Sequence, residues 1–261
     1  MTGFEVGIGG VGLWMPGYSG VESWLAGAPD PEHAQPRGRA LDRMNRRRAS
    51  QLGRALSDAL AESGVQAGVD ASTTPIVVGS AIGEGCTMVG LLEQIFSTEE
   101  PVSPAAFSVS VHNAAAGLIS ISNKNEGFAS ALSAESDTPA ASLIEGIGLV
   151  ATTDAPVGVV CGDEPVPVHL LSEDQRWSLQ AAAVTLVPLE SNTKCLARLR
   201  VVLDGTPDLV PAELDLPGSR NPQAGMVDLV AAVARGQTGC VRLDRGAGRG
   251  YCAVVTSAPI S

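Results

Sequence analysis

The residues best able to do chemistry are Ser136 and Asp137, with one histidine, His112, upstream of them. A serine hydroxyl becomes a nucleophile when a histidine removes its proton and a carboxylate orients that histidine. One hypothesis is therefore an acyl hydrolase or transferase that uses Ser136 and His112. The alternative is structural: Ser136, Asp137 and Thr138 cap a helix, while His112 and Asn113 bridge buried loops through hydrogen bonds.

Two further patterns look like functional motifs but are better explained by structure. The sequence GIGGVG at residues 7–12 satisfies G-x-G-x-x-G, yet a dinucleotide site needs a helix directly after its last glycine. Here Pro16 and Gly17 would break such a helix. Cys86 lies near the start of a predicted helix, but no base or cation stands beside it in the sequence, so we interpret it as a packing cysteine.

The segments that would position Ser136 follow one another between residues 104 and 165. Their periodicity predicts a helix of small residues, a short strand, a helix with Pro139 in its first turn, and a buried strand. The expected ranges are 110–122, 128–134, 140–150 and 157–161. Ser136 falls where the short strand passes into the second helix, a position at which α/β folds usually present chemistry.

The rest of the chain continues the alternation of strands and helices. Strands are expected at 4–14, 75–80, 177–188 and 196–204, helices at 41–63, 83–96 and 223–235, and a hairpin at 240–257 around the sequence RGAGRG. This order predicts an α/β fold with a mostly parallel sheet and some antiparallel edges.

Composition narrows the function. The 261 residues suffice for one large domain or two small ones, and a formal net charge of −11 argues against nucleic-acid binding. Five scattered cysteines favour reduced thiols in the cytoplasm, and three dispersed histidines give no metal site. The sequence also shows no export signal and no apolar run long enough to span a membrane.

The central segment resembles the N-terminal half of the β-ketoacyl synthases, which have a thiolase-like fold. The resemblance is carried by SVSVHNAAAG at 108–117, ALSA at 131–134 and DEPVP at 163–167. Within that family the chain is most similar to the short, chain-length-factor-like proteins of aryl polyene and related type II polyketide or fatty-acid pathways. The resemblance implies an α/β thiolase-like layered fold with a complete N-terminal half, residues 1–190. A strongly truncated C-terminal portion, residues 191–261, would complete the same domain.

The resemblance also bears on catalysis. In the family, a cysteine at the N-terminus of the helix after the third strand accepts the acyl chain, and two histidines from the second half assist decarboxylation. Ser136 stands at the cysteine position, and residues 191–261 contain no histidine. A helix dipole contributes only about 0.3–2 kcal/mol, which cannot ionise a serine. Whether the chain is an enzyme stays open, but the resemblance implies a subunit without condensing activity and without a cofactor.

The leading hypothesis is a noncatalytic subunit that pairs with an active β-ketoacyl synthase and meets an acyl carrier protein. The alternatives are the Ser136/His112 enzyme and a homodimeric acyl- or carrier-binding module. The family buries its third strand against a second subunit, so the resemblance assigns the seam to a set of residues on and near the uncharged strand 128–134. These are Phe128, Ala129, Ser130, Ala131, Leu132, Ser133, His112 and Asn113.

A second candidate surface is basic. Seven of the chain's 17 cationic residues lie between Arg37 and Arg54. Arg43, Arg46, Arg47 and Arg48 are the expected contacts for an acidic partner such as a carrier protein. The alternative is a solvated face with local ion pairs to Asp42 and Asp58.

Overall fold

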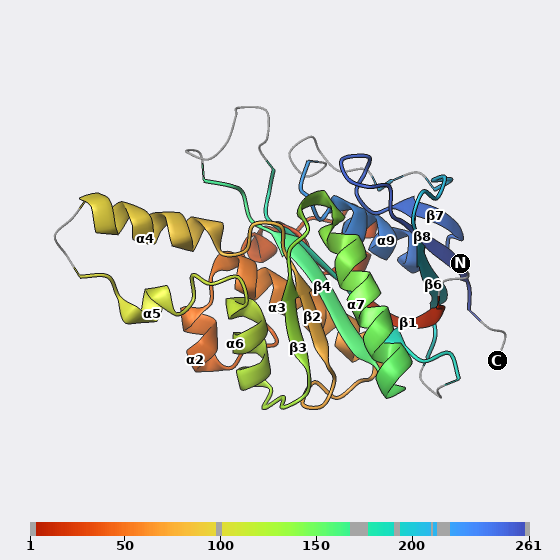
Figure 1. The fold of residues 1–261 in the computed structure, drawn as a ribbon, viewed down its shortest axis with the longest axis horizontal. Coiled ribbons are helices and arrows are strands. Elements are labelled where there is room, and N and C mark those ends of the chain that lie inside the picture. The colour runs from red at the N-terminus through yellow and green to blue at the C-terminus, as the bar shows by residue number, and fades with distance from the viewer. Residues whose placement is uncertain are drawn as a thin grey trace.

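Eight strands form one sheet in the order β3-β2-β4-β5-β1-β6-β8-β7 (Figure 1). The computed structural model describes residues 4–97, 101–167, 177–190, 194–209, 211–212 and 220–258. The strands are β1 (Val6–Trp14), β2 (Ile76–Gly79), β3 (Ala129–Leu132), β4 (Val157–Asp163), β5 (Gln180–Val187), β6 (Ala197–Val202), β7 (Gly239–Arg242) and β8 (Cys252–Ser257).

Only β3, β2 and β4 run parallel to one another, and every other neighbouring pair is antiparallel. The expectation of a mostly parallel sheet is therefore wrong. β4 and β5 are buried at every position and are apolar except at Asp163, Gln180 and Thr185, a pattern typical of parallel strands. Here it arises because helices cover both faces of antiparallel strands.

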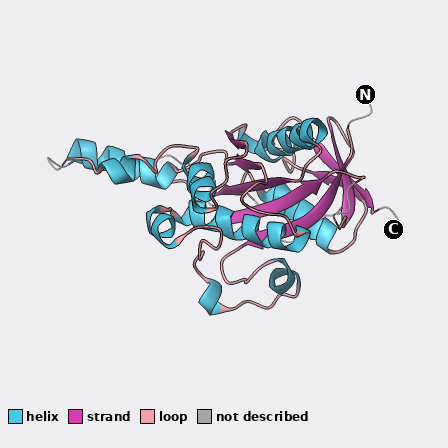
Figure 2. Ribbon diagram, turned by 90° about the horizontal axis from the view of Figure 1, so that it is seen from below, coloured by secondary structure: helices cyan, strands magenta, loops and turns pink. Residues whose placement is uncertain are grey.

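Helices lie on the two faces of the sheet (Figure 2). α3 (Gln51–Ala67) packs on one face, and α7 (Thr138–Thr153) and α9 (Ala224–Ala234) pack on the other. Because side chains alternate along a strand, β5 serves both layers. Ala181 and Ala183 join the cluster under α3, whereas Ala182 and Val184 join the cluster under α7 and α9.

The glycine motif of β1 belongs to helix packing. A Cβ atom at Gly10 would collide with the carbonyl oxygen of Ser63, and one at Gly12 with that of Ala59. Both carbonyls belong to α3, so the glycines let the helix backbone approach the strand closely. All six motif residues lie inside β1 or its ladder, and no helix follows Gly12, which excludes the dinucleotide geometry.

The remaining described elements are all helical. They are α1 (Val21–Leu25), η1 (Pro31–His33), α2 (Arg43–Arg48), α4 (Gly85–Ser97), α5 (Pro104–Phe107), α6 (Ala114–Ser122) and η2 (Glu135–Asp137). α4 and α5 project away from the sheet as an arm, on the left of Figure 1.

Several predicted helices differ from the observed ones. The single helix expected at 41–63 is two helices, because Ala49 and Ser50 are extended and Ser50 accepts a hydrogen bond from Gly53 N at 2.8 Å to begin α3. The helix expected at 110–122 begins only at Ala114, and the one expected at 140–150 spans Thr138–Thr153. Helix ends depend on caps more than on periodicity, which explains these differences.

Candidate functional site

Ser136 lies in η2, between the end of β3 and the start of α7. The preceding residue, Glu135, has a φ of 51°. This left-handed conformation is unusual for a residue other than glycine and sets up the sharp passage from strand to helix. Ser136 is half-buried, and its hydroxyl has no hydrogen-bond partner among the described residues. The predicted location of Ser136 at the strand-to-helix junction is therefore confirmed.

Asp137 does not cap α7 with its side chain, contrary to the structural alternative above. Its carboxylate instead accepts a hydrogen bond from Arg249 N at 2.9 Å, and Arg249 Nε lies 3.8 Å from the second oxygen. A Cβ atom at Gly248 would collide with the same carboxylate. Asp137 thus holds the loop of the β7–β8 hairpin against the strand-to-helix junction, and both oxygens of its carboxylate contact Arg249.

His112 contacts the end of β2 and has no hydrogen bond to Ser136. Its Nε2 lies 2.8 Å from the carbonyl oxygen of Ser80. A carbonyl only accepts, so Nε2 carries the proton of the neutral ring and Nδ1 is the basic nitrogen, which has no hydrogen bond to Ser136 among the described residues. His112 bridges two loops, which is the role that the structural alternative assigned to it.

Ser80, His112 and Asp163 contain the residue types of a catalytic triad, but they are connected differently. In a triad the histidine bonds the serine hydroxyl. Here Ser80 Oγ donates to Asp163 Oδ1 at 2.5 Å and accepts from Gly83 N at 2.8 Å. Ser80 is buried, so this hydroxyl is a structural turn element rather than a nucleophile.

The carboxylate of Asp163 is the centre of a buried polar network. It accepts hydrogen bonds from Ala81 N, Ile82 N and Gln223 Nε2 at 3.0, 3.1 and 2.6 Å. Burial raises the pKa of Asp163, and these donors oppose the rise. The network joins the end of β2 to the N-terminus of α9, and nothing in the local sequence of either segment signals it.

Two more buried acids hold the root of the arm. Glu164 accepts a hydrogen bond from Cys86 N in the first turn of α4 at 2.8 Å, and Glu84 accepts one from Ser50 Oγ at 2.9 Å. The second oxygen of Glu84 has no hydrogen-bond partner among the described residues, and burial raises the pKa of Glu84 to about 7. Burial and these carboxylates together raise the pKa of the Cys86 thiol to about 12. Cys86 therefore stays protonated at neutral pH and is a poor nucleophile.

β3 is an edge strand of the sheet, as its position in the predicted seam requires. The carbonyl oxygens of Phe128 and Leu132 accept hydrogen bonds from Ile76 N and Ser80 N of β2. Because backbone groups alternate along a parallel pair, those of Ala129 and Ala131 point to the open side. An open, uncharged edge is a ready template for another strand.

The helices beside this edge carry exposed apolar side chains. Three alanines of α6, at 114–116, are buried within the chain, so they are not available to a partner. The exposed positions of α6 follow the spacing i, i+4, i+8: Asn113, Gly117 and Ile121. Phe128 precedes β3 and is 49 % exposed. Ile121 and Phe128 are therefore exposed apolar side chains on the segments next to the strand edge.

The exposed apolar character of the arm was not anticipated from the sequence. Only two residues of α4 are buried, while four large apolar residues are exposed: Met88, Leu92, Ile95 and Phe96. Phe96 is 84 % exposed, and Phe107 of α5 is also exposed. The available signal was that α4 is apolar on all sides, with Glu93 as its single charged residue. Such a helix is ordinarily buried or covered by a partner.

The arginines of α2 are exposed and lack acidic partners among the described residues. Asp42 caps α2 by accepting hydrogen bonds from Met44 N and Asn45 N, so the ion pairs expected with it do not form. Asp58 does pair, but with Arg39, whose Nε lies 3.5 Å away. Arg46 bonds two backbone carbonyls and Arg48 bonds Ser108 Oγ, which leaves Arg43 and Arg47 without a hydrogen bond.

Neither a metal site nor a membrane helix is found in the described part of the chain. Its His, Cys, Asp and Glu side chains form no group of three that could hold a metal ion. No described helix is long and apolar enough to cross a bilayer. His169 lies outside the described residues.

Residues 22–244 match the family model described as "Beta-ketoacyl synthase, N-terminal domain". The chain belongs to this family. No curated protein sequence matches the chain significantly.

Solved structures of family complexes share its fold. A chain of the ketosynthase ApeO in complex with its chain length factor ApeC, from Xenorhabdus doucetiae, aligns with a TM-score of 0.68 and 21% identity, covering 96% of this chain and 98% of that one. A chain of the ishigamide ketosynthase/chain length factor aligns with a TM-score of 0.70 and 14% identity, covering 99% and 100%. A chain of the AntDE:AntF complex, a ketosynthase with its type II polyketide acyl-carrier protein, aligns with a TM-score of 0.65 and 12% identity, covering 98% and 99%. At these identities the likeness establishes the fold, a thiolase-like layered α/β domain.

Proposed function

We propose that this chain is a noncatalytic, chain-length-factor-like subunit that pairs with an active β-ketoacyl synthase in carrier-protein-dependent elongation of polyene, polyketide or fatty-acid chains. The observation that carries the proposal is the open edge of β3, flanked by exposed apolar side chains. The structural neighbours support it, because they come from complexes of a ketosynthase with a chain length factor.

The noncatalytic part of the proposal rests on the junction after β3. Ser136 stands where the family has its cysteine, and its hydroxyl has no base among the described residues. His112 donates to Ser80 O, and Asp137 is held by Arg249 N. No observation therefore favours the hydrolase alternative, which needs both side chains turned towards Ser136.

The partner-binding part assigns a role to each exposed apolar element. The strand edge, Phe128 to Ser133, would pair with a strand of the synthase and continue the sheet. His112 and Asn113 would flank that seam, and the arm would lie across the partner and bury Phe96 and Phe107. Pairing would remove the exposed apolar side chains of these elements from water, so we expect a stable heterodimer.

The carrier-protein part rests on charge. Exposed arginines on a chain of net charge −11 form a local positive potential that would steer an acidic protein towards α2. One of the structural neighbours is described as a ketosynthase bound to its acyl-carrier protein. We assign this docking role to Arg43, Arg46, Arg47 and Arg48.

Two further statements belong to the proposal. Residues 191–261 complete the domain begun by residues 1–190, which is supported by β6, β7 and β8 joining the same sheet as β1 to β5. A cytoplasmic location is supported by the described cysteines, all of which are free thiols.

The decisive experiment is reconstitution. An active β-ketoacyl synthase encoded beside this chain is assayed for elongation on an acyl carrier protein, alone and with the chain added, and the mixture is analysed by size-exclusion chromatography with light scattering. We expect a one-to-one complex that elongates, and no elongation by the chain alone. Elongation by the chain alone would refute the noncatalytic role, and a homodimer that ignores the synthase would favour the binding-module alternative.

A further inference from the structure

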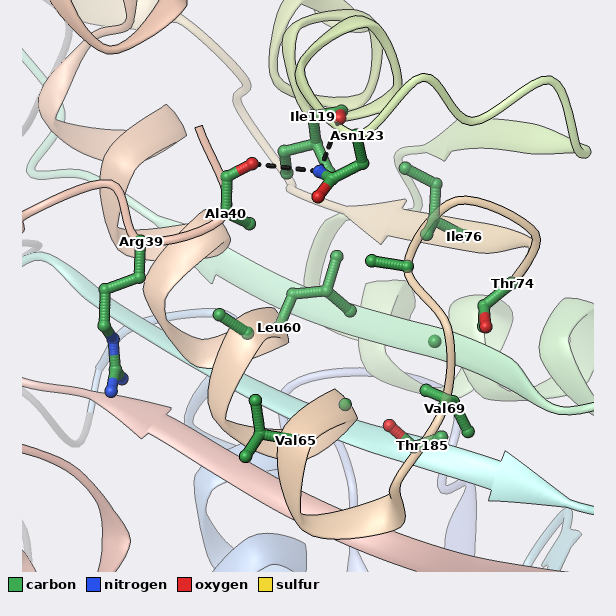
Figure 3. A pocket seen from close by; sticks show the side chains of 14 residues that line it. Arg39, Ala40, Leu60, Val65, Val69, Thr74, Ile76, Ile119, Asn123 and Thr185 are labelled. Atoms are coloured by element: carbon green, nitrogen blue, oxygen red, sulfur yellow. Dashed lines mark hydrogen bonds between the residues drawn. The ribbon is translucent and has the colours of Figure 1, made fainter. Parts of the chain in front are cut away.

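A cavity of about 220 Å³ lies at the opposite end of the sheet from Ser136 (Figure 3). It is bounded by the second half of α3, the end of α6 and the first residues of β2 and β4. Its walls are mainly aliphatic and come from Leu60, Val65, Val69, Ile76 and Ile119. β2, β3 and β4 run parallel, so their first residues lie at one edge of the sheet and their last residues at the other. The cavity lies at the first edge, whereas Ser136 follows the last residue of β3. The two sites are therefore separate.

Glycines keep the cavity open. Gly64 of α3 and Gly158 of β4 line it without side chains. A Cβ atom at Gly158 would lie 2.8 Å from Leu60 Cδ1, so a larger residue there would push into the space. At Gly64 a Cβ atom would meet only Val69 Cγ2, at 3.6 Å, which leaves room for a side chain.

The polar side chains that line the cavity have hydrogen-bond partners within the described residues, except for the amide oxygen of Asn123. Thr185 Oγ1 bonds Ser63 Oγ at 3.2 Å, and Thr74 Oγ1 bonds Asp70 O at 2.7 Å. Asn123 Nδ2 donates to Ala40 O at 2.9 Å and to Ile119 O at 2.8 Å. A carbonyl oxygen only accepts hydrogen bonds, so the atom of the Asn123 amide that lies near both carbonyls must be its nitrogen. The two hydrogen bonds therefore fix the orientation of this amide.

The oxygen of that amide consequently faces the cavity. Figure 3 shows the Asn123 oxygen directed towards Leu60, on the side away from both carbonyls. It has no hydrogen-bond partner among the described residues. A fixed acceptor at the edge of an apolar cavity is the kind of polar group that orients a bound molecule.

The charge of the lining favours a neutral ligand. Arg39 is the single charged residue that lines the cavity. Its guanidinium is already compensated, with Nε 3.5 Å from Asp58 Oδ1 and Nη2 3.9 Å from Glu62 Oε2. A ligand carboxylate would have to compete with both acids, whereas a neutral molecule would leave them in place.

We propose that this cavity binds a small neutral alcohol or phenol, whose apolar body fills the space and whose hydroxyl donates a hydrogen bond to Asn123 Oδ1. Size supports the assignment, because an apolar cavity of about 150 Å³ takes up benzene and this one is somewhat larger. The ligand class accordingly has roughly six to nine non-hydrogen atoms. This site is independent of pairing with a synthase.

The test compares two nearly isosteric probes, phenol and benzene, on the full chain. Backbone amide shifts are followed in ¹⁵N-labelled protein during titration with each probe. We expect saturable shifts at Gly64, Asn123 and Gly158, and tighter binding of phenol by about threefold or more, the effect of one net hydrogen bond. Equal or tighter binding of benzene would refute the role of Asn123, and the absence of saturable shifts with both probes would refute the site.

A cavity-filling variant separates this site from weak surface binding. Gly64→Leu should abolish the saturable shifts at Asn123 and Gly158. The matched control is Gly148→Leu, on an exposed position of α7 with nothing within 4 Å of its Cβ, which should bind phenol as the wild type does. Should Gly64→Leu fail to fold, Val69→Phe fills the same space from the turn that follows α3. Unchanged phenol affinity in a folded filling variant would place the binding elsewhere and overturn the proposal.

Discussion

Asp137, next to Ser136, accepts a hydrogen bond from the backbone N–H of Arg249, 112 residues later in the chain. The contact joins the strand-to-helix junction of the first half to the β7–β8 hairpin of the last segment. The hairpin is anchored from its other side as well, because Arg245 bonds the buried carboxylate of Asp228 in α9 at 2.5–2.6 Å. A carboxylate that could have oriented a catalytic base instead stabilises the fold.

We therefore expect Asp137→Ala to lower the free energy of unfolding by about 1–3 kcal/mol, since it leaves a donor of the loop without a charged acceptor. Urea unfolding followed by circular dichroism measures the change. Glu126→Ala, at an exposed loop residue, is the control and should unfold as the wild type does. A loss of less than about 0.5 kcal/mol, the usual effect of a surface substitution, would mean that the contact contributes little.

Acylation of Ser136 should not occur. The chain, incubated with an acyl carrier protein loaded with an acyl group, should keep its unmodified mass, because Ser136 has no base and its hydroxyl stays protonated. Intact-protein mass spectrometry gives the answer, with Ser136→Ala measured in parallel. An acyl adduct that disappears in Ser136→Ala would show that the junction retains chemistry.

A charged side chain introduced into the predicted seam should weaken the heterodimer. Ala131 is half-buried on the open edge, and Ala131→Arg would place a guanidinium in the strand pairing, at a cost of about 3–5 kcal/mol if it is desolvated there without a partner. The dissociation constant of the heterodimer should therefore rise by about 100-fold or more. Analytical ultracentrifugation at micromolar concentration measures it.

The control for the seam is Ala234→Arg, at an exposed position at the end of α9. It should dimerise normally. A wild-type chain that stays monomeric with its synthase, or an Ala131→Arg chain that pairs as the wild type does, would remove β3 from the interface.

Charge reversal on α2 should slow the encounter with an acidic carrier protein. Arg43 and Arg47 are suited to the test, because their side chains make no hydrogen bond within the described structure. Arg43→Glu/Arg47→Glu should lower the association rate by about tenfold at low salt, and added salt should reduce the difference. Stopped-flow fluorescence with a labelled carrier protein measures the rate.

The control for α2 has the same net charge. Arg220→Glu/Arg235→Glu changes two exposed arginines outside α2, so the long-range repulsion is matched. Equal rates for the two double variants would show that net charge alone, rather than the position of the arginines, governs association.

The buried Glu84 should make stability depend on pH. Its pKa is raised from 4.5 to about 7 in the folded chain, so between these values the native state binds more protons than the unfolded state. The contribution of Glu84 to stability is therefore lost as the pH rises from 4.5 to about 7, by about 3 kcal/mol in total. Glu84→Gln keeps an acceptor for Ser50 Oγ and removes the titration, so its unfolding free energy should fall less over this interval.

Urea unfolding at pH 5 and pH 8 measures this difference. The comparison is made between the wild type and Glu84→Gln, because Glu62, Asp163, Glu164 and Asp228 also have raised pKa values and contribute to the slope in both proteins. Glu126→Gln serves as the exposed control. Parallel pH profiles for wild type and Glu84→Gln would mean that Glu84 is solvated or paired in solution.

Local sequence determined the strands and their boundaries to within a few residues, but the helices less well, because the helix expected at 41–63 is two helices. Apolar runs and turn residues placed β2 to β8, and the motif at 108–117 with the strand at 128–134 led to the family that the match over residues 22–244 establishes. Ser136, which we predict to stand at the nucleophile position, and the absence of histidine after residue 190 are also properties of sequence alone. These features depend on residue type and on spacing along the chain, so they need no knowledge of neighbours in space.

Tertiary structure decided which groups meet. His112 contacts Ser80, 32 residues away, and Asp137 contacts Arg249, 112 residues away. The strand directions, the unpaired arginines of α2 and the exposed α4 likewise depend on packing between distant segments. Hydrophobic periodicity records that a residue is buried but not against what, and a carboxylate can bond any donor that the fold brings near it. Partners at long separation therefore emerge only when the whole sheet and its helices are assembled.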